Sequence, residues 1–143
     1  MARPMTDDEL RAFLSHGTRT GKLGTTRADG RPHVAPIWFV LGDDGTVVFM
    51  TGRRTVKGTA LRKDPRACLC VDDEAPPFAF VVIEGAVELS EDLDAMLPWS
   101  IKIAGRYMGD DQAEQFGRRN AVAGEMLVRL PLTKVVALID IAD

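Results

Sequence analysis

Cysteine and histidine are scarce in this 143-residue chain, which contains two residues of each. Cys68 and Cys70 are separated by one residue, so in a strand both side chains would point to the same side. With only His16 and His33 as further ligands, a metal site would need groups from distant parts of the chain. We therefore predict no metal site and interpret both thiols as small side chains packed in the core.

Long hydrophobic runs and an excess of positive charge are also missing. The longest apolar run, Phe78–Ile83, is too short to cross a bilayer, and the N-terminus lacks the apolar core of a signal peptide. The net charge of −3 argues against general nucleic-acid binding, which needs a basic surface. These absences predict a cytoplasmic protein with no membrane span and no nucleic-acid partner.

The remaining composition is that of one folded domain. Hydrophobic residues make up 45% of the chain and charged residues 27%, as in ordinary globular proteins. A chain of this length buries enough apolar surface for one core, and it has no internal repeats or linkers. We predict a single domain over residues 1–143.

The chain alternates between β-rich runs joined by tight turns and a few helices. The first helix begins at Thr6, which has capping-box spacing to Glu9. Ser90 is predicted to cap a longer helix that ends near Tyr107 and that Pro98 kinks or splits. The other predicted helices are 55–63 and 111–122, and the predicted strands are 19–27, 34–40, 46–51, 66–72, 78–89, 125–130 and 133–141.

Short connections between most of these strands favour antiparallel pairing. A closed or nearly closed barrel is the economical solution, because it removes unpaired sheet edges. A parallel doubly wound fold would need crossover helices that are missing, and no G-x-G-x-x-G opens a helix. The sequence therefore predicts a mainly β fold, an antiparallel β-barrel with peripheral helices.

A basic cluster follows the predicted hairpin in the stretch from Asp29 to Gly58. Arg53, Arg54 and Lys57 lie at the start of the helix 55–63. Free backbone N–H groups and the helix dipole make such a start suitable for an anion. Lys57 would oppose the dipole unless an anion lay between them. A solvated surface cluster is the alternative interpretation.

Several motifs in and after this stretch resemble those of the pyridoxamine 5'-phosphate oxidase-like split-barrel superfamily. They are D-G-R-P-H-V-A-P-I-W-F at 29–39, T-G-R-R-T-V-K at 51–57, L-R-K-D-P-R at 61–66 and F-V-V-I-E-G at 80–85. The resemblance covers most of the chain and implies a split barrel of the FMN-binding type. The short length, the T-G-x-x-x-x-K motif and the L-R-x-D-P-R helix end look most like the deazaflavin (coenzyme F420)-dependent oxidoreductases of actinobacteria.

The resemblance also implies a homodimer with two cofactor sites at the subunit interface. The cofactor phosphate would lie at Arg54, Thr55 and Lys57, although the sequence does not decide between Arg53 and Arg54. Trp38 is interpreted as a core or interface residue. The remaining residues implied for the cofactor ring are His33, Ala35, Pro36, Ile37, Met50 and Thr51, and those predicted to shape a substrate pocket are Trp99, Lys102 and Tyr107.

The implied activity is hydride transfer from reduced deazaflavin to an unsaturated acceptor, such as a quinone, an enone or a tetrapyrrole like biliverdin. No nucleophile–base pair or paired carboxylates are recognisable, which fits an enzyme whose cofactor carries the chemistry, and no catalytic residue is assigned. Two alternatives stay open. One is an FMN-dependent oxidase or reductase of the same fold. The other is a non-catalytic cofactor- or heme-binding protein, with His16 and His33 as the imidazole candidates.

Overall fold

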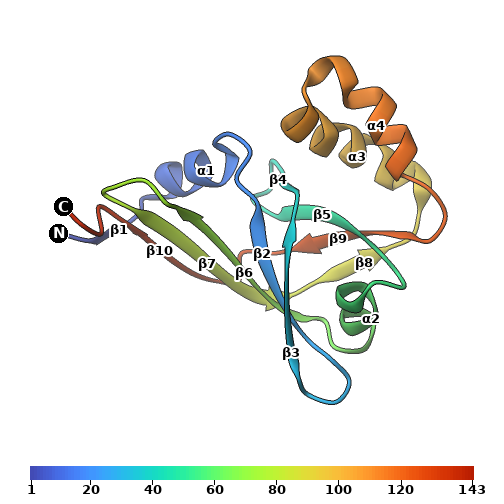
Figure 1. Cartoon of the computed structure of the whole chain (residues 1–143), viewed down its shortest axis with the longest axis horizontal. Coiled ribbons are helices and arrows are strands. Elements are labelled where there is room, and N and C mark those ends of the chain that lie inside the picture. Colours follow the sequence, from blue (N-terminus) through green and yellow to red (C-terminus); the bar gives the residue numbers. More distant parts are fainter.

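The computed structural model describes all residues from Met1 to Asp143, which form two antiparallel sheets arranged as a split barrel (Figure 1). The six-stranded sheet has the order β1-β10-β7-β6-β2-β3, and the four-stranded sheet has the order β4-β5-β9-β8. The strands are β1 Arg3–Pro4, β2 Gly21–Thr26, β3 Pro32–Ile37, β4 Phe39–Leu41, β5 Val47–Gly52, β6 Arg66–Asp73, β7 Ala79–Ala86, β8 Glu88–Ser90, β9 Glu125–Leu130 and β10 Lys134–Ile139.

The helices lie around the sheets and contribute little to the barrel wall. They are α1 Asp7–Ser15, α2 Val56–Lys63, α3 Leu93–Met108 and α4 Ala113–Asn120, with a short 3-10 helix at Asp110–Gln112. In Figure 1, α3 and α4 pack together as a pair beside β4 and β5, while α2 lies near the other end of β5. This arrangement confirms the predicted mainly β fold with peripheral helices.

The core fills the space between the two sheets because β2, β6 and β7 alternate buried and outward residues along their length. The same packing brings in Leu14 of α1 and Leu61 of α2, which are 0% and 1% exposed. The largest contributions from the strands are Leu23, Leu69, Val81 and Ile83 from the six-stranded sheet, and Phe39, Phe49, Val128 and Leu130 from the four-stranded sheet.

Two predicted strands are each divided between the sheets. Residues 34–40 contain the end of β3, which belongs to the six-stranded sheet, and the start of β4, which belongs to the other; Trp38 lies between them. Residues 78–89 are divided in the same way into β7 and β8 at Val87. The prediction of two unbroken strands was wrong, because a chain that changes sheets must interrupt its hydrogen-bond ladder at the crossing.

The helical pair differs from the prediction at both ends. Asp92 caps α3, and its carboxylate accepts hydrogen bonds from the backbone N–H groups of Asp94 and Ala95 at 3.0 and 3.4 Å. The predicted cap, Ser90, ends β8 instead. Helix α3 continues through Pro98, which removes one early hydrogen bond without splitting the helix. The predicted helix 111–122 is the shorter α4, preceded by the 3-10 turn.

The two cysteines share one face of β6, but that face points away from the core. Their neighbours Ala67, Leu69 and Val71 are the buried residues of this strand, and Cys68 and Cys70 are only partly buried. Interpreting them as core thiols was therefore wrong. Burial still raises the pKa of both thiols, so the protonated form is favoured at neutral pH.

Arg106 of α3 connects the helical pair to the barrel. Its guanidinium donates hydrogen bonds to the carbonyl oxygens of Leu14 at 2.8 Å, Gly17 at 2.9 Å and Phe39 at 2.6 Å. No carboxylate pairs with this charge, and burial lowers the pKa of Arg106. One side chain thus binds the end of α1, the following turn and β4 to α3.

Candidate functional site

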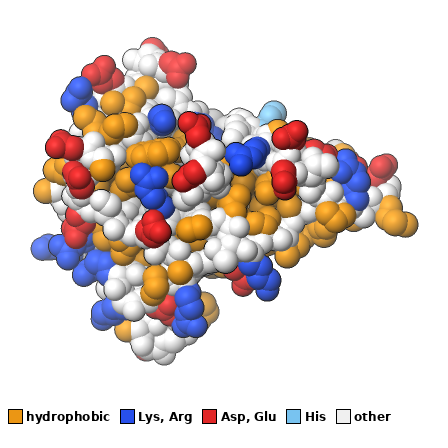
Figure 2. Space-filling model, turned by 180° about the vertical axis from the view of Figure 1, so that it is seen from behind, with side chains coloured by type: hydrophobic (Ala, Val, Ile, Leu, Met, Phe, Trp, Pro, Cys, Tyr) orange, Lys and Arg blue, Asp and Glu red, His pale blue; other side chains and the backbone are white.

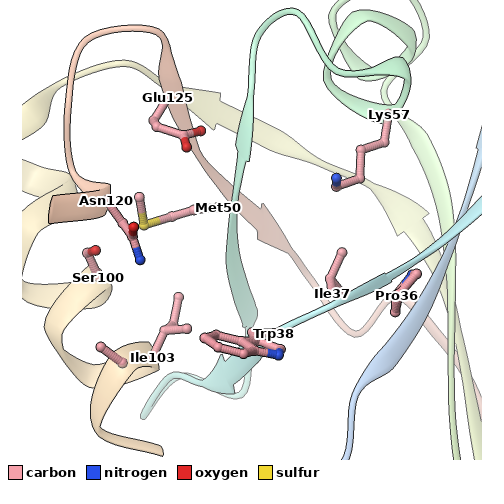
Figure 3. A pocket seen from close by; sticks show the side chains of 10 residues that line it. Pro36, Ile37, Trp38, Met50, Lys57, Ser100, Ile103, Asn120 and Glu125 are labelled. Atoms are coloured by element: carbon pink, nitrogen blue, oxygen red, sulfur yellow. The ribbon is translucent and has the colours of Figure 1, made fainter. Parts of the chain in front are cut away.

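A cavity of about 350 Å³ opens where β3, β5, α2 and the helical pair meet. Figure 3 shows Lys57 and Glu125 projecting toward it from either side of β5 in that view, with Trp38 and Ile103 at the opposite end. The cavity therefore has one charged end and one apolar end. Its lining residues are Pro36, Ile37, Trp38, Met50, Lys57, Ser100, Ile103, Ala104, Asn120 and Glu125.

Lys57 is held in place by the capped first turn of α2. The Thr55 hydroxyl accepts a hydrogen bond from the backbone N–H of Gly58 at 3.0 Å and donates one to the carbonyl of Gly52 at 2.8 Å. A further hydrogen bond joins the hydroxyls of Thr55 and Thr51 at 3.0 Å. The absence of a side chain on Gly58 lets this turn pack directly on the Gly52 carbonyl. These hydrogen bonds connect the loop before the helix both to β5 and to the first turn of α2.

The two arginines of this loop have different surroundings. Arg53 forms an ion pair with Glu91 at 3.2 Å, and its carbonyl accepts a hydrogen bond from Arg62 at 3.1 Å. Arg54 forms no ion pair with any carboxylate. It lines two open cavities on either side of the loop, of about 880 and 290 Å³. Arg54 and Lys57 are thus the cations of the α2 start that form no direct ion pair, although the Glu125 carboxyl group lies in the same cavity as Lys57.

Trp38 forms the flat wall at the apolar end of the cavity. Its indole stacks on the ring of Tyr107, with the ring centroids 4.9 Å apart and an angle of 3° between the planes. The Tyr107 hydroxyl donates a hydrogen bond to the Arg19 carbonyl at 2.8 Å and accepts one from the Phe39 N–H at 3.2 Å. Burial raises the pKa of Tyr107, which keeps this donor protonated. Tyr107 therefore fixes the orientation of Trp38.

Glu125, the first residue of β9, brings a carboxyl group into the charged end. Its Oε2 atom is buried and has no hydrogen-bond partner. Burial raises the pKa of Glu125, while the positive charge of Lys57 acts in the opposite direction. The side chain lines the cavity that contains Lys57 and also the neighbouring cavity that contains Arg54.

The structure separates the predicted cofactor residues into three places. Pro36, Ile37, Met50 and Lys57 line the main cavity. Arg54 and Thr55 line the two neighbouring cavities, and buried Thr51 bonds to Thr55. His33 lies opposite buried Thr25 of β2, with its Nδ1 atom buried and without a hydrogen-bond partner, and Ala35 is partly buried on the same strand.

The predicted substrate residues lie outside the main cavity. Trp99 packs beside Val48, Met96 and Leu127, and the Lys102 ammonium lies 4.5 Å from the centroid of its ring. Tyr107 reaches the cavity indirectly, through Trp38. Their part in substrate binding stays a prediction.

The lining residues that sequence reasoning missed come mostly from the last third of the chain. Ser100, Ile103 and Ala104 belong to the predicted helix but carry no chemical signal, and Ser100 already donates to the Gly117 carbonyl at 2.8 Å. Asn120 and Glu125 flank the connection between α4 and β9. Their proximity to Lys57 depends on the pairing of β9 with β5, which sequence periodicity does not reveal.

Two further features bear on the class of site. No group of three or more His, Cys, Asp or Glu side chains converges as the ligands of a metal ion would. None of the helices has the length and apolar character needed to cross a membrane.

The fold and the cavity together define a split-barrel protein with a cationic helix start at the mouth of a partly apolar cavity. The sequence profile of the pyridoxamine 5'-phosphate oxidase family matches residues 6–126, so the chain belongs to that family. A pyridoxine/pyridoxamine 5'-phosphate oxidase from Alkalilimnicola ehrlichii is 36% identical over 78 residues. This alignment covers 54% of the present chain and 39% of that enzyme, so the chain spans much less than the full length of this curated relative.

Solved structures share the fold over nearly the whole chain. A conserved hypothetical protein from Mycobacterium tuberculosis has a TM-score of 0.82 at 25% identity, covering 95% of this chain and 86% of its own. A structure described as an F420 reductase has a TM-score of 0.68 at 22% identity, covering 87% and 94%. The same fold occurs in an FAD-binding protein from Mesorhizobium loti and in the heme storage protein HutZ from Vibrio cholerae. At these identities the last three show the fold alone.

Proposed function

We propose that this protein is an oxidoreductase that binds the deazaflavin coenzyme F420. It would transfer a hydride from the reduced coenzyme to an unsaturated small molecule. The observation that supports this most directly is the composition of the main cavity. One end presents the Lys57 ammonium, and the walls at the other end are Pro36, Ile37 and Trp38. A ring with an anionic side arm needs this combination of surfaces.

The donor set at the α2 start fits a phosphate group. Neither Lys57 nor Arg54 forms a direct ion pair, although the whole chain contains more Asp and Glu than Lys and Arg. Hydrogen bonds from such cations to phosphate are charge-assisted and stronger than neutral ones. Arg53 is neutralised by Glu91, so we assign the phosphate contact to Arg54 rather than Arg53. Thr55 would hold the loop in position rather than supply charge.

The bound deazaflavin would supply the hydride, and the protein would supply orientation and exclusion of water. The flat Trp38 surface and the apolar side chains of Ile37 and Ile103 favour planar conjugated molecules beside it. Quinones, enones and tetrapyrroles meet this requirement.

The outer face of the six-stranded sheet supports the predicted homodimer. Side chains there alternate with the core residues, and the charges on this face are paired, Lys22 with Asp72 and Lys134 with Glu84. Figure 2 shows hydrophobic side chains gathering in a band that extends toward the end of the molecule carrying the two termini. We propose that a second copy covers the outer sheet face. The apolar residues of this face are Pro32, Val34, Pro36, Cys68, Cys70, Phe80, Val82, Val136 and Leu138.

Fluorescence titration of the purified protein with F420 and with FMN tests the cofactor assignment. Replacing Lys57 and Arg54 together by Met and Gln should weaken F420 binding by at least about tenfold, because each charge-assisted hydrogen bond contributes roughly 1.5–3 kcal/mol. The matched control is Arg118→Gln, which removes one exposed charge on α4 that lines none of the three cavities. Equal affinity of the double variant and the parent would contradict the phosphate site.

FMN is the second candidate, because the family to which the chain belongs is named for pyridoxamine 5'-phosphate oxidase. Both cofactors carry a three-ring system and a ribityl phosphate, so Lys57 and Arg54 suit either. If the protein is yellow and retains FMN through purification, FMN rather than F420 is the favoured cofactor. Consumption of reduced F420 with one of the acceptor classes would support the oxidoreductase. Binding without any turnover would favour a cofactor carrier.

A further inference from the structure

The position of Glu125 creates a conflict with the proposed phosphate site. Glu125 pairs with Gly52 across the β5–β9 ladder, and a side chain on Gly52 would bring its Cβ within 3.6 Å of the Glu125 Oε2 atom. The carboxyl group therefore lies directly against the loop that leads into α2. A negative charge at this place is unfavourable for a second anion, because two adjacent anions oppose each other's ionisation.

The groups facing Glu125 come from three elements. Lys57 extends from α2 into the same cavity, and Asn120 at the end of α4 adds a neutral amide. In the neighbouring cavity the loop supplies Arg53 and Arg54, and α2 supplies Arg62. Arg53 already has Glu91 as its partner. The ionised form of Glu125 is consequently favoured by Lys57, one of the two cations that we assign to the phosphate.

We propose that Glu125 couples anion binding to proton uptake, so that the site accepts the phosphate group of its ligand together with one proton on the Glu125 carboxylate. The inference rests on the phosphate site proposed above. In the free protein the Glu125 carboxylate is the internal counter-ion of the Lys57 ammonium. When a phosphate takes over this role, the carboxylate acquires a proton from solvent and becomes a neutral acid. No other bond is formed or broken.

The structure supports this exchange independently of the cation pattern. The buried Oε2 atom has no hydrogen-bond donor to hold it in the ionised form. Burial also raises the pKa of Glu125 in the free protein, which lowers the cost of protonation. Because the complex binds more protons than the free protein, affinity should rise as the pH falls. The limit for one proton is about tenfold per pH unit.

Calorimetry measures the coupling without reference to enzymatic activity. F420 is titrated into the protein at neutral pH in two buffers that differ in ionisation enthalpy, which gives the number of protons taken up. The phosphate of F420 is a diester and does not titrate in this range, and comparison with Glu125→Gln removes the contribution of other ionisable groups of the ligand. We expect the proton uptake of the parent protein to exceed that of Glu125→Gln by nearly one proton. The amide variant should also bind more tightly than the parent at pH 8.

Glu91→Gln is the matched control, since it removes a carboxylate of the same type from an exposed ion pair beside the loop. This variant should change the affinity by the same factor at every pH and leave the proton uptake unchanged. Equal uptake by the parent and Glu125→Gln would overturn the proposal, and so would weaker binding by Glu125→Gln at every pH. Thermal unfolding of each variant verifies that it is folded.

A second measurement follows Glu125 itself. In protein labelled with carbon-13 at the glutamate carboxyl groups, the Glu125 signal is identified by its absence from Glu125→Gln, and its pKa should increase when ligand is added. An unchanged pKa would overturn the coupling. If neither F420 nor FMN binds, the proposed function fails, and inorganic pyrophosphate then serves as the probe. A rise in the Glu125 pKa with pyrophosphate would support the coupling, and no rise would reject it.

Discussion

A buried carboxylate oxygen without a hydrogen-bond partner destabilises a folded protein, because ionised carboxylates lose strong hydration on burial. Glu125 carries such an atom at the edge of the candidate site. Several other carboxylates in this protein are stabilised locally; Arg3 and the capping N–H of Thr6 lower the pKa of Glu9 to about 2. The contrast between these residues indicates that Glu125 is placed for the site rather than for stability.

Glu125→Gln should therefore stabilise the protein relative to the parent above the ordinary pKa of glutamate, 4.5. The pKa of Glu125 is raised by folding, so the folded protein holds the proton more tightly than the unfolded chain. The stabilising contribution is complete below pH 4.5 and is lost as the pH rises through the raised pKa. Urea unfolding between pH 4 and 8 should show that the free energy of unfolding of Glu125→Gln exceeds that of the parent by an amount that grows with pH. A difference independent of pH would contradict this interpretation.

At the scale of elements, the attachment of the helical pair depends on Arg106. Three backbone carbonyls from α1, the following turn and β4 accept from its guanidinium. A lysine has no planar fork that could reach all three. The helical pair, which supplies Ser100, Ile103 and Ala104 to the cavity, is thus held against the barrel at one end by Arg106 and by its neighbour Tyr107.

Arg106→Lys should lower the free energy of unfolding by roughly 1–3 kcal/mol, because the partly buried carbonyl groups of Leu14 and Phe39 lose their donor. Urea unfolding followed by tryptophan fluorescence measures this, and Trp38 and Trp99 lie on both sides of the attachment. Arg118→Lys on the exposed face of α4 is the matched control and should have little effect. Comparable unfolding energies for the two variants would show that Arg106 does not anchor the helices.

Element boundaries show where sequence reasoning succeeds. Helix α1 was predicted correctly, because its Thr6–Glu9 capping box is a local pattern and both of its hydrogen bonds are present. The divisions at Trp38 and Val87 were not predicted, since apolar runs continue through both points. Where a strand changes sheets depends on partners far away in the chain. The outward orientation of Cys68 was misjudged for the same reason, because period-two alternation does not say which face is the core.

In the candidate site, too, the residues marked by nearby sequence could be predicted, and those brought in by long-range strand pairing could not. Lys57 could be singled out from its position in the first turn of a short helix, and Pro36 and Met50 followed from the family resemblance. Asn120 and Glu125 reach Lys57 only through the β5–β9 pairing. No spacing in the sequence connects residue 57 to residue 125. A buried, unpartnered carboxylate can be recognised only when its surroundings are known.

On the scale of the whole molecule, the exposed sheet face predicts self-association. Val34 is 67% exposed at the edge of the six-stranded sheet, and Val136 is 46% exposed on the same face. Covering such an apolar face with a second copy would gain about 25 cal/mol for each Å² removed from water. The cofactor residues implied on β3 would then lie close to the partner subunit.

Val34→Glu should convert a dimer into a monomer, because a carboxylate placed within the covered apolar face cannot be desolvated without cost. Sedimentation equilibrium gives the mass directly. Leu93→Glu provides the control, since Leu93 is also exposed but lies on α3, away from the sheet face. A parent protein that is already monomeric, or a Val34→Glu variant that remains dimeric, would contradict the predicted interface.

The placement of Trp38 has a mechanical consequence for the cavity. The residue occupies the junction where the chain leaves one sheet for the other, and Tyr107 braces its ring from the side of α3. Side chains of both sheets share one core, so a substitution there that shifts one sheet against the other would move this junction. Any such movement would tilt the Trp38 indole and change the width of the main cavity beside it. Substitutions deep between the sheets, at Phe39 or Phe49, would therefore change how a bound ligand fits the cavity, although neither side chain lines it.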